Sequence, residues 1–148
     1  MRPSIVNSME IIKNISPEFK DGRGDITRIL DDGTTTINSV LIIRRLKWAI
    51  GANHRHKKDT HYCYFLSGKA EYYEKPAKGG EILSAVIETG DMVFSPAMTT
   101  HAMKFLEDSV FIALATESRN QEDYESDTVR EKIIWMSELT FGLLGAGY

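Results

Sequence analysis

All four histidines of the chain fall into one short pattern that suits metal binding. His54, His56 and His61 lie within eight residues, and His101 follows forty residues after His61. Neutral imidazole is the commonest nitrogen ligand for zinc, iron, manganese, nickel and copper in proteins. Histidines scattered at random would rarely cluster in this way with none left over. The spacing predicts one divalent transition metal bound by these four side chains, and the ligand set leaves the identity of the metal open.

Strand geometry explains how the four side chains could meet. Side chains at positions i and i+2 of a strand point to the same face, so His54 and His56 share a face. A short turn at residues 57–60 returns the chain, and His61 then shares its face with Phe65. The fourth histidine follows a proline turn and would complete the site from another strand. We therefore expect the ligands to lie on separate strands that line a common interior.

The rest of the chain consists mainly of short strand-like runs that end at glycine, aspartate or proline. These runs are Met9–Ile15, Asp25–Leu30, Ser39–Ile50, Thr60–Ser67, Lys69–Glu74, Ile82–Glu88, Met92–Ser95, His101–Phe105 and Ser109–Thr116. Many short strands at this spacing are typical of a β-sandwich or β-barrel. A length of 148 residues suits one domain, so we expect residues 1–148 to form a single unit with a barrel core at about 25–118.

The last segment has a different periodicity. From about residue 127 to 143, apolar side chains recur at roughly helical spacing: Val129, Ile133, Ile134, Met136, Leu139 and Leu143. Asp127 or Ser126 could cap such a helix, and the glycines of the tail would end it. The pattern predicts a short C-terminal helix that covers one end of the barrel or packs against a second subunit.

Composition excludes several classes of function. The net charge of −3 gives no electrostatic footprint for nucleic acid, and the chain has no apolar run approaching the roughly 20 residues needed to cross a membrane. The N-terminus lacks the apolar stretch of a signal peptide, and the single cysteine rules out an internal disulfide. We expect a cytoplasmic protein that acts on a small molecule and binds neither nucleic acid nor membrane.

Two stretches resemble the conserved motifs of the cupin superfamily. The first motif is Gly-x5-His-x-His-x3/4-Glu-x6-Gly, and here His54, His56, His61 and Gly68 follow its spacing. The second is Gly-x5-Pro-x-Gly-x2-His-x3-Asn, which Gly90, Pro96 and His101 follow. The two motifs occur in the correct order over residues 51–68 and 90–105. The resemblance implies an all-β fold, the double-stranded β-helix or jelly-roll barrel of the cupins, and dimerisation, in which the N-terminal strand segment could exchange.

The chain departs from these motifs at four points. His61 stands where the first motif has glutamate, and only two residues separate Gly51 from His54. Met98 replaces the second glycine of the second motif, and Phe105 replaces its asparagine. Four-histidine sites are a known variation among cupins. Four imidazoles bring no negative charge to the ion, which should leave it a stronger Lewis acid than three imidazoles and a carboxylate would.

Three further stretches resemble the deoxysugar 3,5-epimerases and 3,4-ketoisomerases among the cupins. Phe19-Lys-Asp21-Gly-Arg23-Gly24 is similar to their Phe-x-Asp-x-Arg-Gly turn. Residues 113–117 and 122–127 are similar to the segment that follows the last barrel strand in those enzymes. Gly51-Ala-Asn-His54-Arg-His56 is similar to the ketoisomerase sequence Gly-Ala-His-x-His but is one residue longer. In those enzymes the paired histidines act as acid–base groups and metal is not required. The resemblance implies an isomerase or epimerase of a sugar or sugar nucleotide.

A metal-dependent isomerase needs a general base outside the ligand set, because a ligating nitrogen cannot also carry a proton. The candidates are tyrosines and glutamates near the histidines: Tyr64, Tyr72, Tyr73, Glu74 and Glu117, with Tyr64, Tyr72 and Glu74 preferred. Arg45 and Lys47 could hold a phosphate or carboxylate if their face of the strand points inward, or they could point to solvent. Phe65 and Met103 would line the substrate pocket.

Two other classes of function remain open from the sequence. Four protein ligands on a six-coordinate iron leave two positions for substrate and O₂, so an Fe(II)-dependent cupin dioxygenase is one alternative. A non-catalytic cupin that binds a small ligand is the other. Oxygen uptake would separate the first alternative from an isomerase.

Overall fold

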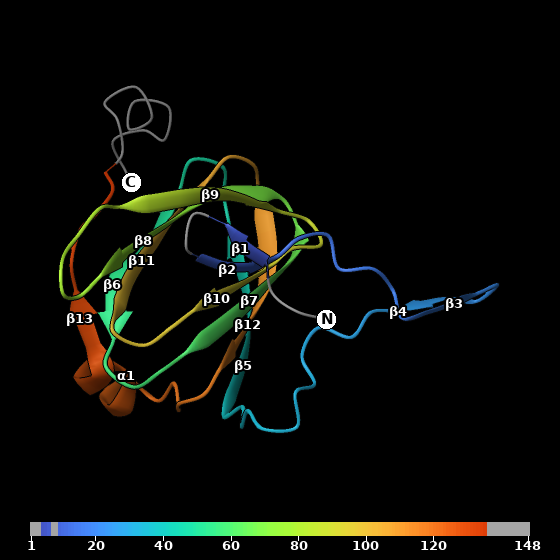
Figure 1. The fold of residues 1–148 in the computed structure, drawn as a ribbon, viewed down its shortest axis with the longest axis horizontal. Helices are drawn as coiled ribbons and strands as arrows, with labels where there is room; N and C mark the ends of the chain where they lie inside the picture. Colours follow the sequence, from blue (N-terminus) through green and yellow to red (C-terminus); the bar gives the residue numbers. More distant parts are fainter. Residues whose placement is uncertain (1–3, 7–8, 136–148) are drawn as a thin grey trace.

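The computed structural model describes residues 4–6 and 9–135, which form a β-barrel of two antiparallel sheets (Figure 1). The six-stranded sheet has the order β1-β2-β10-β7-β12-β5, the five-stranded sheet has the order β13-β6-β11-β8-β9, and β3 and β4 form a separate hairpin. The all-β cupin barrel expected from the sequence is confirmed. Among the described residues, no helix is both long and apolar enough to cross a membrane.

The strands alternate with short turns along the described chain. Their bounds are β1 Ser4–Val6, β2 Met9–Ile12, β3 Phe19–Asp21, β4 Gly24–Ile26, β5 Ser39–Arg45, β6 Ile50–His56, β7 His61–Ser67, β8 Lys69–Pro76, β9 Leu83–Glu88, β10 Met92–Ser95, β11 Thr99–Phe105, β12 Ser109–Ala115 and β13 Thr128–Arg130, and the single helix α1 spans Gln121–Asp127. Most of the predicted runs therefore correspond to strands with similar bounds.

The barrel interior changes from polar to apolar along its length. Two strands share the same inward order of a histidine, a sulfur-containing residue and a phenylalanine: His61, Cys63 and Phe65 on β7, and His101, Met103 and Phe105 on β11. At the apolar end Phe65 stacks on Phe111 with ring centroids 5.1 Å apart. Period-two alternation thus fixes both the packed core and the position of the histidines above it.

Two of the predicted strands have different bounds in the structure. The run Ser39–Ile50 is divided into β5 and β6 by a turn at 46–49 in which Trp48 has φ 74°. The division is needed because β5 belongs to one sheet and β6 to the other. Of the run Asp25–Leu30, only the first residues are in a strand, β4, which pairs with β3 in a hairpin that projects from the barrel in Figure 1.

Gly68, at the tight turn from β7 to β8, shows why the first cupin motif needs a glycine there. Its φ of +102° lies in the region that side-chain-bearing residues avoid. A Cβ at this position would also lie 2.6 Å from the Cα of Ser109. Both the backbone conformation and the contact with β12 exclude a larger residue.

The C-terminal helix predicted at 127–143 is wrong over the part that the structure describes. Helix α1 ends at Asp127, residues 128–130 form β13 on the edge of β6, and residues 131–135 form neither helix nor strand; residues 136–143 lie outside the described part. The open edge of β6 offers backbone hydrogen-bond partners to residues 128–130. These residues could not use those partners if they formed a helix. The Glu131 carboxylate also pairs with Arg55 and Lys75, so tertiary contacts override the helical periodicity.

Candidate metal centre

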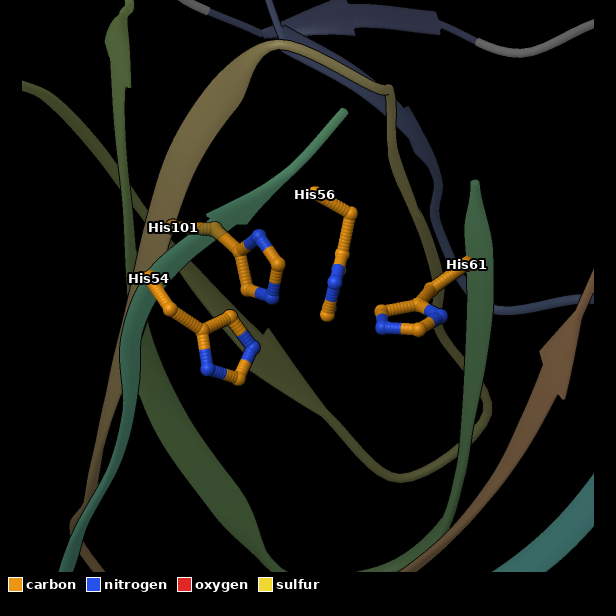
Figure 2. A group of neighbouring side chains, drawn as sticks. All are labelled: His54, His56, His61 and His101. Carbon is orange, nitrogen blue, oxygen red and sulfur yellow. The ribbon is translucent and has the colours of Figure 1, made fainter. Parts of the chain in front are cut away.

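The four histidines converge inside the barrel from three strands. His54 and His56 lie on β6, His61 on β7 and His101 on β11, and Figure 2 shows their rings facing a common centre. Ring centroids are 4.7 Å apart for His54 and His56, 4.8 Å for His56 and His61, and 4.9 Å for His54 and His101. One ligand nitrogen from each side chain lies within 4.8 Å of the others. Nitrogens bound to one ion at about 2.1 Å lie within about 4.2 Å of each other, so a small inward movement of the rings would allow all four to bind.

The stretch from Gly51 to His56 is one residue longer than the ketoisomerase sequence Gly-Ala-His-x-His. A β-bulge at Asn53 accommodates the extra residue. On β6, His54 pairs with His101 and Ala52 pairs with Ala102, so Asn53 is left without a partner on β11. Its φ is 59°, a left-handed conformation that asparagine tolerates better than most residues. Its side-chain Oδ1 accepts hydrogen bonds from the backbone N–H of Ile133 (2.9 Å) and Ile134 (3.2 Å). The C-terminal segment therefore holds the bulge that directs His54 to the interior.

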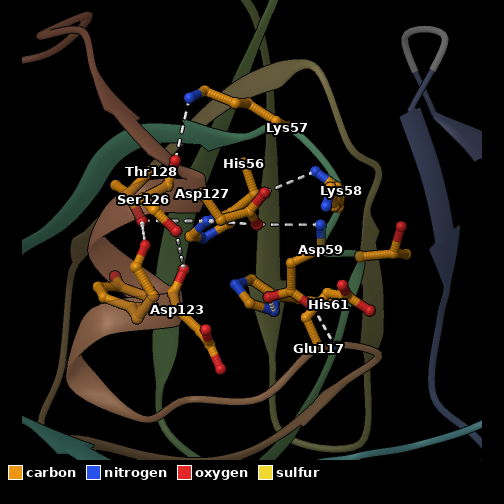
Figure 3. A network of polar contacts seen from close by, with 12 residues as sticks. His56, Lys57, Lys58, Asp59, His61, Glu117, Asp123, Ser126, Asp127 and Thr128 are labelled. Atoms are coloured by element: carbon orange, nitrogen blue, oxygen red, sulfur yellow. Dashed lines mark hydrogen bonds and ion pairs between the residues drawn. The ribbon is translucent and has the colours of Figure 1, made fainter.

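Two aspartates, Asp59 buried and Asp127 partly buried, lie behind the histidines (Figure 3). Asp59 Oδ2 is 3.0 Å from Nδ1 of His61, at the distance but not the angle of a hydrogen bond. Asp127 Oδ2 is 3.7 Å from Nδ1 of His56, which also lies 3.3 Å from the Thr128 hydroxyl. Carboxylates in such positions fix the orientation of a ligand ring and raise its basicity.

Backbone groups hold these two carboxylates in place. Asp59 Oδ1 accepts a hydrogen bond from the N–H of Glu117 (3.0 Å), and Asp127 accepts from the N–H groups of Lys58 (2.9 Å) and Asp59 (3.2 Å). The β6–β7 turn, the end of β12 and helix α1 are thereby tied together around the histidines.

Burial keeps the four imidazoles neutral. It lowers the pKa of His54 to about 2 and the pKa of His61 and His101 to about 3, and it also lowers the pKa of His56. Three buried ring nitrogens have no hydrogen-bond partner among the residues that the structure describes: His56 Nε2, His61 Nδ1 and His101 Nδ1. Buried polar atoms are rarely left unpaired, and neutral imidazole is the form that binds metals. The site therefore fits a divalent metal ion.

The histidines form part of the wall of a cavity of about 110 Å³. Its polar lining is His54, His61, His101, Cys63, Arg45, Arg119 and Tyr124, and its remaining walls are mainly apolar. Larger hollows exist, among them one of about 340 Å³ beside residues 28–32, but the histidines do not line them. The chemistry points to the smaller cavity because three of the four histidines, His54, His61 and His101, line it.

Comparisons of sequence identify no relative, because no family model and no curated protein matches the chain. Solved structures do match. A 3,4-ketoisomerase from Helicobacter canadensis has a TM-score of 0.68 at 18% identity, over 82% of this chain and 90% of that one. The dTDP-4-dehydrorhamnose 3,5-epimerase from Sulfolobus tokodaii has a TM-score of 0.66 at 15% identity, over 81% and 77%. The chain has a cupin fold.

A third structural neighbour is much longer than this chain. The capsular polysaccharide assembling protein CapF from Staphylococcus aureus matches with a TM-score of 0.60 at 22% identity, over 76% of this chain. The chain spans about a third of the CapF chain, 33% of its length. At such identities the likeness concerns the fold, so the function has to be argued from the site.

The structure separates the substrate-binding residues expected from the sequence into two groups. Arg45 and Met103 line the cavity of this cupin. Phe65 is fully buried in the apolar core below the cavity. Lys47 lies beyond the end of β5, with its Nζ 4.9 Å from the centre of the Trp48 ring. The face of β5 that carries Arg45 therefore points inward, as one of the two expectations had it. The strand ends at Arg45, so Lys47 is not part of that face.

Tyr72 and Glu74, two of the expected catalytic residues, form a buried pair beside the site. The Tyr72 hydroxyl donates to Glu74 Oε2 (2.6 Å) and lies 2.7 Å from the Ser95 hydroxyl. Glu74 is opposite His101 on the neighbouring strand. Burial raises the pKa of both Tyr72 and Glu74. Neither residue lines the cavity, so the pair supports the wall that holds His101.

The other expected bases lie away from the cavity lining. Strand alternation puts Tyr64 on the outer face of the six-stranded sheet, opposite to His61. The Tyr73 hydroxyl donates to the Glu71 carboxylate. Glu117 is tied to Asp59 through its backbone N–H rather than through its carboxylate.

Sequence reasoning missed Arg119 and Tyr124 in the lining and Asp59 and Asp127 behind the rings. Arg119 and Tyr124 belong to the segment after the last barrel strand, whose resemblance to the sugar-modifying cupins was a usable signal. Asp59 stands two residues before His61, and such an acidic residue next to a ligand is a local signal. Asp127 was assigned to helix capping, and only the fold brings it to His56.

Proposed function

We propose that the chain is a metal-dependent cupin enzyme that isomerises or epimerises a small oxygenated carbonyl compound of the sugar or sugar-nucleotide kind. The observation that carries this proposal is the convergence of four neutral imidazoles inside the barrel. Three of them are buried with an unpartnered nitrogen, and three of them line a cavity. His54, His56, His61 and His101 would hold the ion. A bound divalent ion would supply Lewis acidity to a substrate carbonyl, which acidifies the neighbouring C–H bond.

The protein would hold the ligands in place and keep the site partly dry. The carboxylates of Asp59 and Asp127 lie 3.0 Å from Nδ1 of His61 and 3.7 Å from Nδ1 of His56, where their charges would orient the two rings. Their negative charges also compensate for a ligand set that has none of its own. Ile43 and Phe111 form apolar walls that limit the access of water to the reacting atoms.

Tyr124 is the residue that we propose for proton transfer. It lines the cavity, and its ring centroid is 5.4 Å from that of His56 and 6.2 Å from that of His54. Cys63 also lines the cavity, but burial raises the pKa of its thiol to about 12, so it remains protonated. Tyr72 and Glu74 do not reach the lining. Tyr124 therefore replaces them as the acid–base group.

Structural neighbours support enolisation as the reaction class. A variant of a 3,4-ketoisomerase from Thermoanaerobacterium thermosaccharolyticum was crystallised with TDP-4-keto-6-deoxyglucose, and a 3,5-epimerase from Legionella pneumophila with dTDP-4-keto-L-rhamnose. Both ligands carry a ketone beside a carbon that can lose a proton. A structure of CapF contains the inhibitor 3-isopropenyl-tropolone, whose adjacent oxygens form a chelating group.

Two measurements on the purified chain test the proposal. Elemental analysis should find about one divalent ion per chain, before or after loading with zinc, iron or manganese. With a keto sugar such as TDP-4-keto-6-deoxyglucose in ²H₂O, NMR should then show deuterium entering the carbon beside the ketone. Tyr124→Phe should slow this exchange by about 10²- to 10⁴-fold. Tyr62→Phe, on the outer face of β7, should leave it unchanged and serves as the matched control.

The alternatives give different results in the same samples. Oxygen uptake by the iron-loaded chain with a diketone, thiol or catechol, without deuterium exchange, would assign it to the dioxygenases. Metal binding with neither reaction would indicate a ligand-binding cupin. A site that stays empty after loading with each metal would defeat the proposal.

A further inference from the structure

The charged groups that line the cavity are all cationic. Arg45 and Arg119 are there, and no carboxylate of the described residues is part of the lining. The imidazoles beside them are neutral, and a metal ion would add further positive charge. A cavity with this balance of charge attracts anions.

Four of the seven arginines that the structure describes are paired with carboxylates, and these two are not. Carboxylates neutralise the guanidinium groups of Arg23, Arg28, Arg55 and Arg130. Among the described arginines, Arg44, Arg45 and Arg119 lack such a partner, and two of these three line the cavity. A guanidinium offers donors in a planar fork that matches a carboxylate, so an unpaired arginine in a cavity wall is suited to bind one.

Arg119 is held where it can reach a ligand beside the histidines. Its guanidinium carbon is 4.2 Å from the centre of the Tyr124 ring, and that ring contacts His54 and His56. Its positive charge is also one of the causes that lower the pKa of His61 and of both β6 histidines. The stacking on Tyr124 fixes the plane of the guanidinium and leaves its N–H donors available.

Arg45 extends along another part of the same cavity. A Cβ built on Gly51 would lie 3.6 Å from its Nε, so the Arg45 side chain runs beside β6 in van der Waals contact with this position. Its Nη1 donates to the backbone oxygen of Arg44 (3.1 Å), and its other N–H groups have no partner among the described residues. The neighbouring Arg44 is on the opposite face of β5 and does not line the cavity.

The size of the cavity limits what it can take. Pockets that enclose a drug-sized ligand measure about 300–1,000 Å³. At about 110 Å³ this cavity has room for a compact acid beside the histidines, and the nucleotide part of a nucleoside diphosphate sugar would have to lie outside it.

We propose that the cavity binds a small α-oxo or α-hydroxy carboxylate, a compact sugar acid among them, with the carboxylate held by Arg119 and with Arg45 as a second cation. The oxo or hydroxy oxygen then faces the imidazoles. This inference rests on the proposed function, because it names the substrate class of the same site. The inference adds that the substrate must carry a negative charge, which neither a bound metal nor the cupin fold requires.

Calorimetric titration of the zinc-loaded chain with pyruvate and with neutral methyl pyruvate tests the inference. Pyruvate should bind at least about tenfold more tightly than its ester, since a charged hydrogen bond is lost with the ester. Arg119→Met should weaken pyruvate binding by about tenfold or more, Arg119→Lys should do so less, and Arg45→Met should weaken it too. Arg44→Met, one residue away on the outer face, should leave it unchanged. Circular dichroism of each variant controls for folding.

The outcomes separate this inference from the proposed function. Equal binding of pyruvate and methyl pyruvate, or pyruvate binding unaffected by Arg119→Met, overturns the inference even if the chain holds its metal. Binding of TDP that depends on Arg119 and displaces pyruvate also overturns it, because the cations then serve a diphosphate. A chain that holds no metal but keeps the Arg119-dependent preference for pyruvate defeats the metal-dependent function and leaves the anion site intact.

Discussion

Two aspartates act on single histidines of the candidate site. An imidazole ligand needs a fixed ring orientation and a free nitrogen that carries no proton. The carboxylate of Asp59 would orient the His61 ring, and Asp127 with Thr128 would orient the His56 ring. Burial lowers the pKa of both rings and so keeps the ligating nitrogen free of a proton. The aspartates are as much a part of the site as the ligands themselves.

Replacement of Asp59 by asparagine should weaken metal binding by about 10- to 100-fold, because the His61 ring loses the negative charge that orients it. Competition with a chelator of known affinity measures this loss. Glu122→Gln is the control, since Glu122 is exposed on α1 and has no partner among the described residues. Equal affinities for the two variants would show that Asp59 has no influence on the site.

The buried histidines should make the metal-free protein sensitive to acid. His61 and His101 have pKa values of about 3 when folded, against 6.5 as the ordinary value. Between these values the unfolded chain binds protons that the folded chain does not, so the free energy of unfolding falls as the pH falls from about 6.5 toward 3. Their contribution to stability is complete above pH 6.5.

Urea unfolding in the presence of a chelator, from pH 7.5 to pH 4.5, measures this dependence. The midpoint should fall with pH, and His101→Gln should flatten the profile because glutamine does not titrate. A wild-type profile no steeper than that of the variant would contradict the neutral, buried state of His101.

At the scale of the elements, the geometry of β6 depends on a contact far away in the sequence. The bulge at Asn53 sets the register on β11, and residues 131–134 hold the bulge through its side chain and its backbone oxygen. Strand β13 also covers the edge of β6. The segment after α1 is therefore a support for the strand that carries His54 and His56.

Asn53→Ala should lower the free energy of unfolding by about 2 kcal/mol, through loss of the partly buried hydrogen bonds of its side chain and of a residue that tolerates positive φ. Asn53→Gly should cost less, because glycine keeps the backbone conformation. Both should weaken metal binding, since the direction of His54 depends on the bulge. Chemical denaturation and chelator competition measure the two effects.

Asn14 offers a matched control for this prediction. It also has a positive φ, of 47°, but it lies at the β9–β10 turn, where its backbone N–H donates to Asp91. Asn14→Ala should lower stability without a change in metal affinity. If Asn53→Ala behaves in the same way, the bulge does not direct the ligand.

On the scale of the whole molecule, the histidines join the two sheets. His61 belongs to the six-stranded sheet, and the other three belong to the five-stranded sheet. An ion held by all four would link the sheets across the barrel interior. Binding to the folded chain alone would stabilise it by mass action.

A thousandfold excess of metal over its Kd should add about 4 kcal/mol and raise the Tm by roughly 10 °C. The stabilisation by metal should decrease more in His61→Ala than in His54→Ala. Only His61→Ala leaves all the remaining ligands on one sheet, so that the ion no longer links the two sheets. Calorimetry of each variant with and without metal gives the increment directly. Equal increments in the two variants would show that the link between the sheets adds nothing.

The sequence by itself determined the strands, the glycine turn and the histidine ligand candidates. Period-two alternation and motif spacing are local properties, so they could be read from residues 51–68 and 90–105 without a fold. Dimerisation and the identity of the metal stay predictions, since no contact of the described residues bears on them.

Only the tertiary structure decided which other residues join the site. The C-terminal segment pairs with β6 instead of forming a helix, because an open strand edge outweighs a weak periodicity. The path of the same segment across the barrel brings Arg119, Tyr124 and Asp127 close to the histidines. Phe65, in contrast, is buried in the core and does not line the cavity. Contacts between residues sixty or more positions apart leave no local pattern, so they become visible only when the chain has folded.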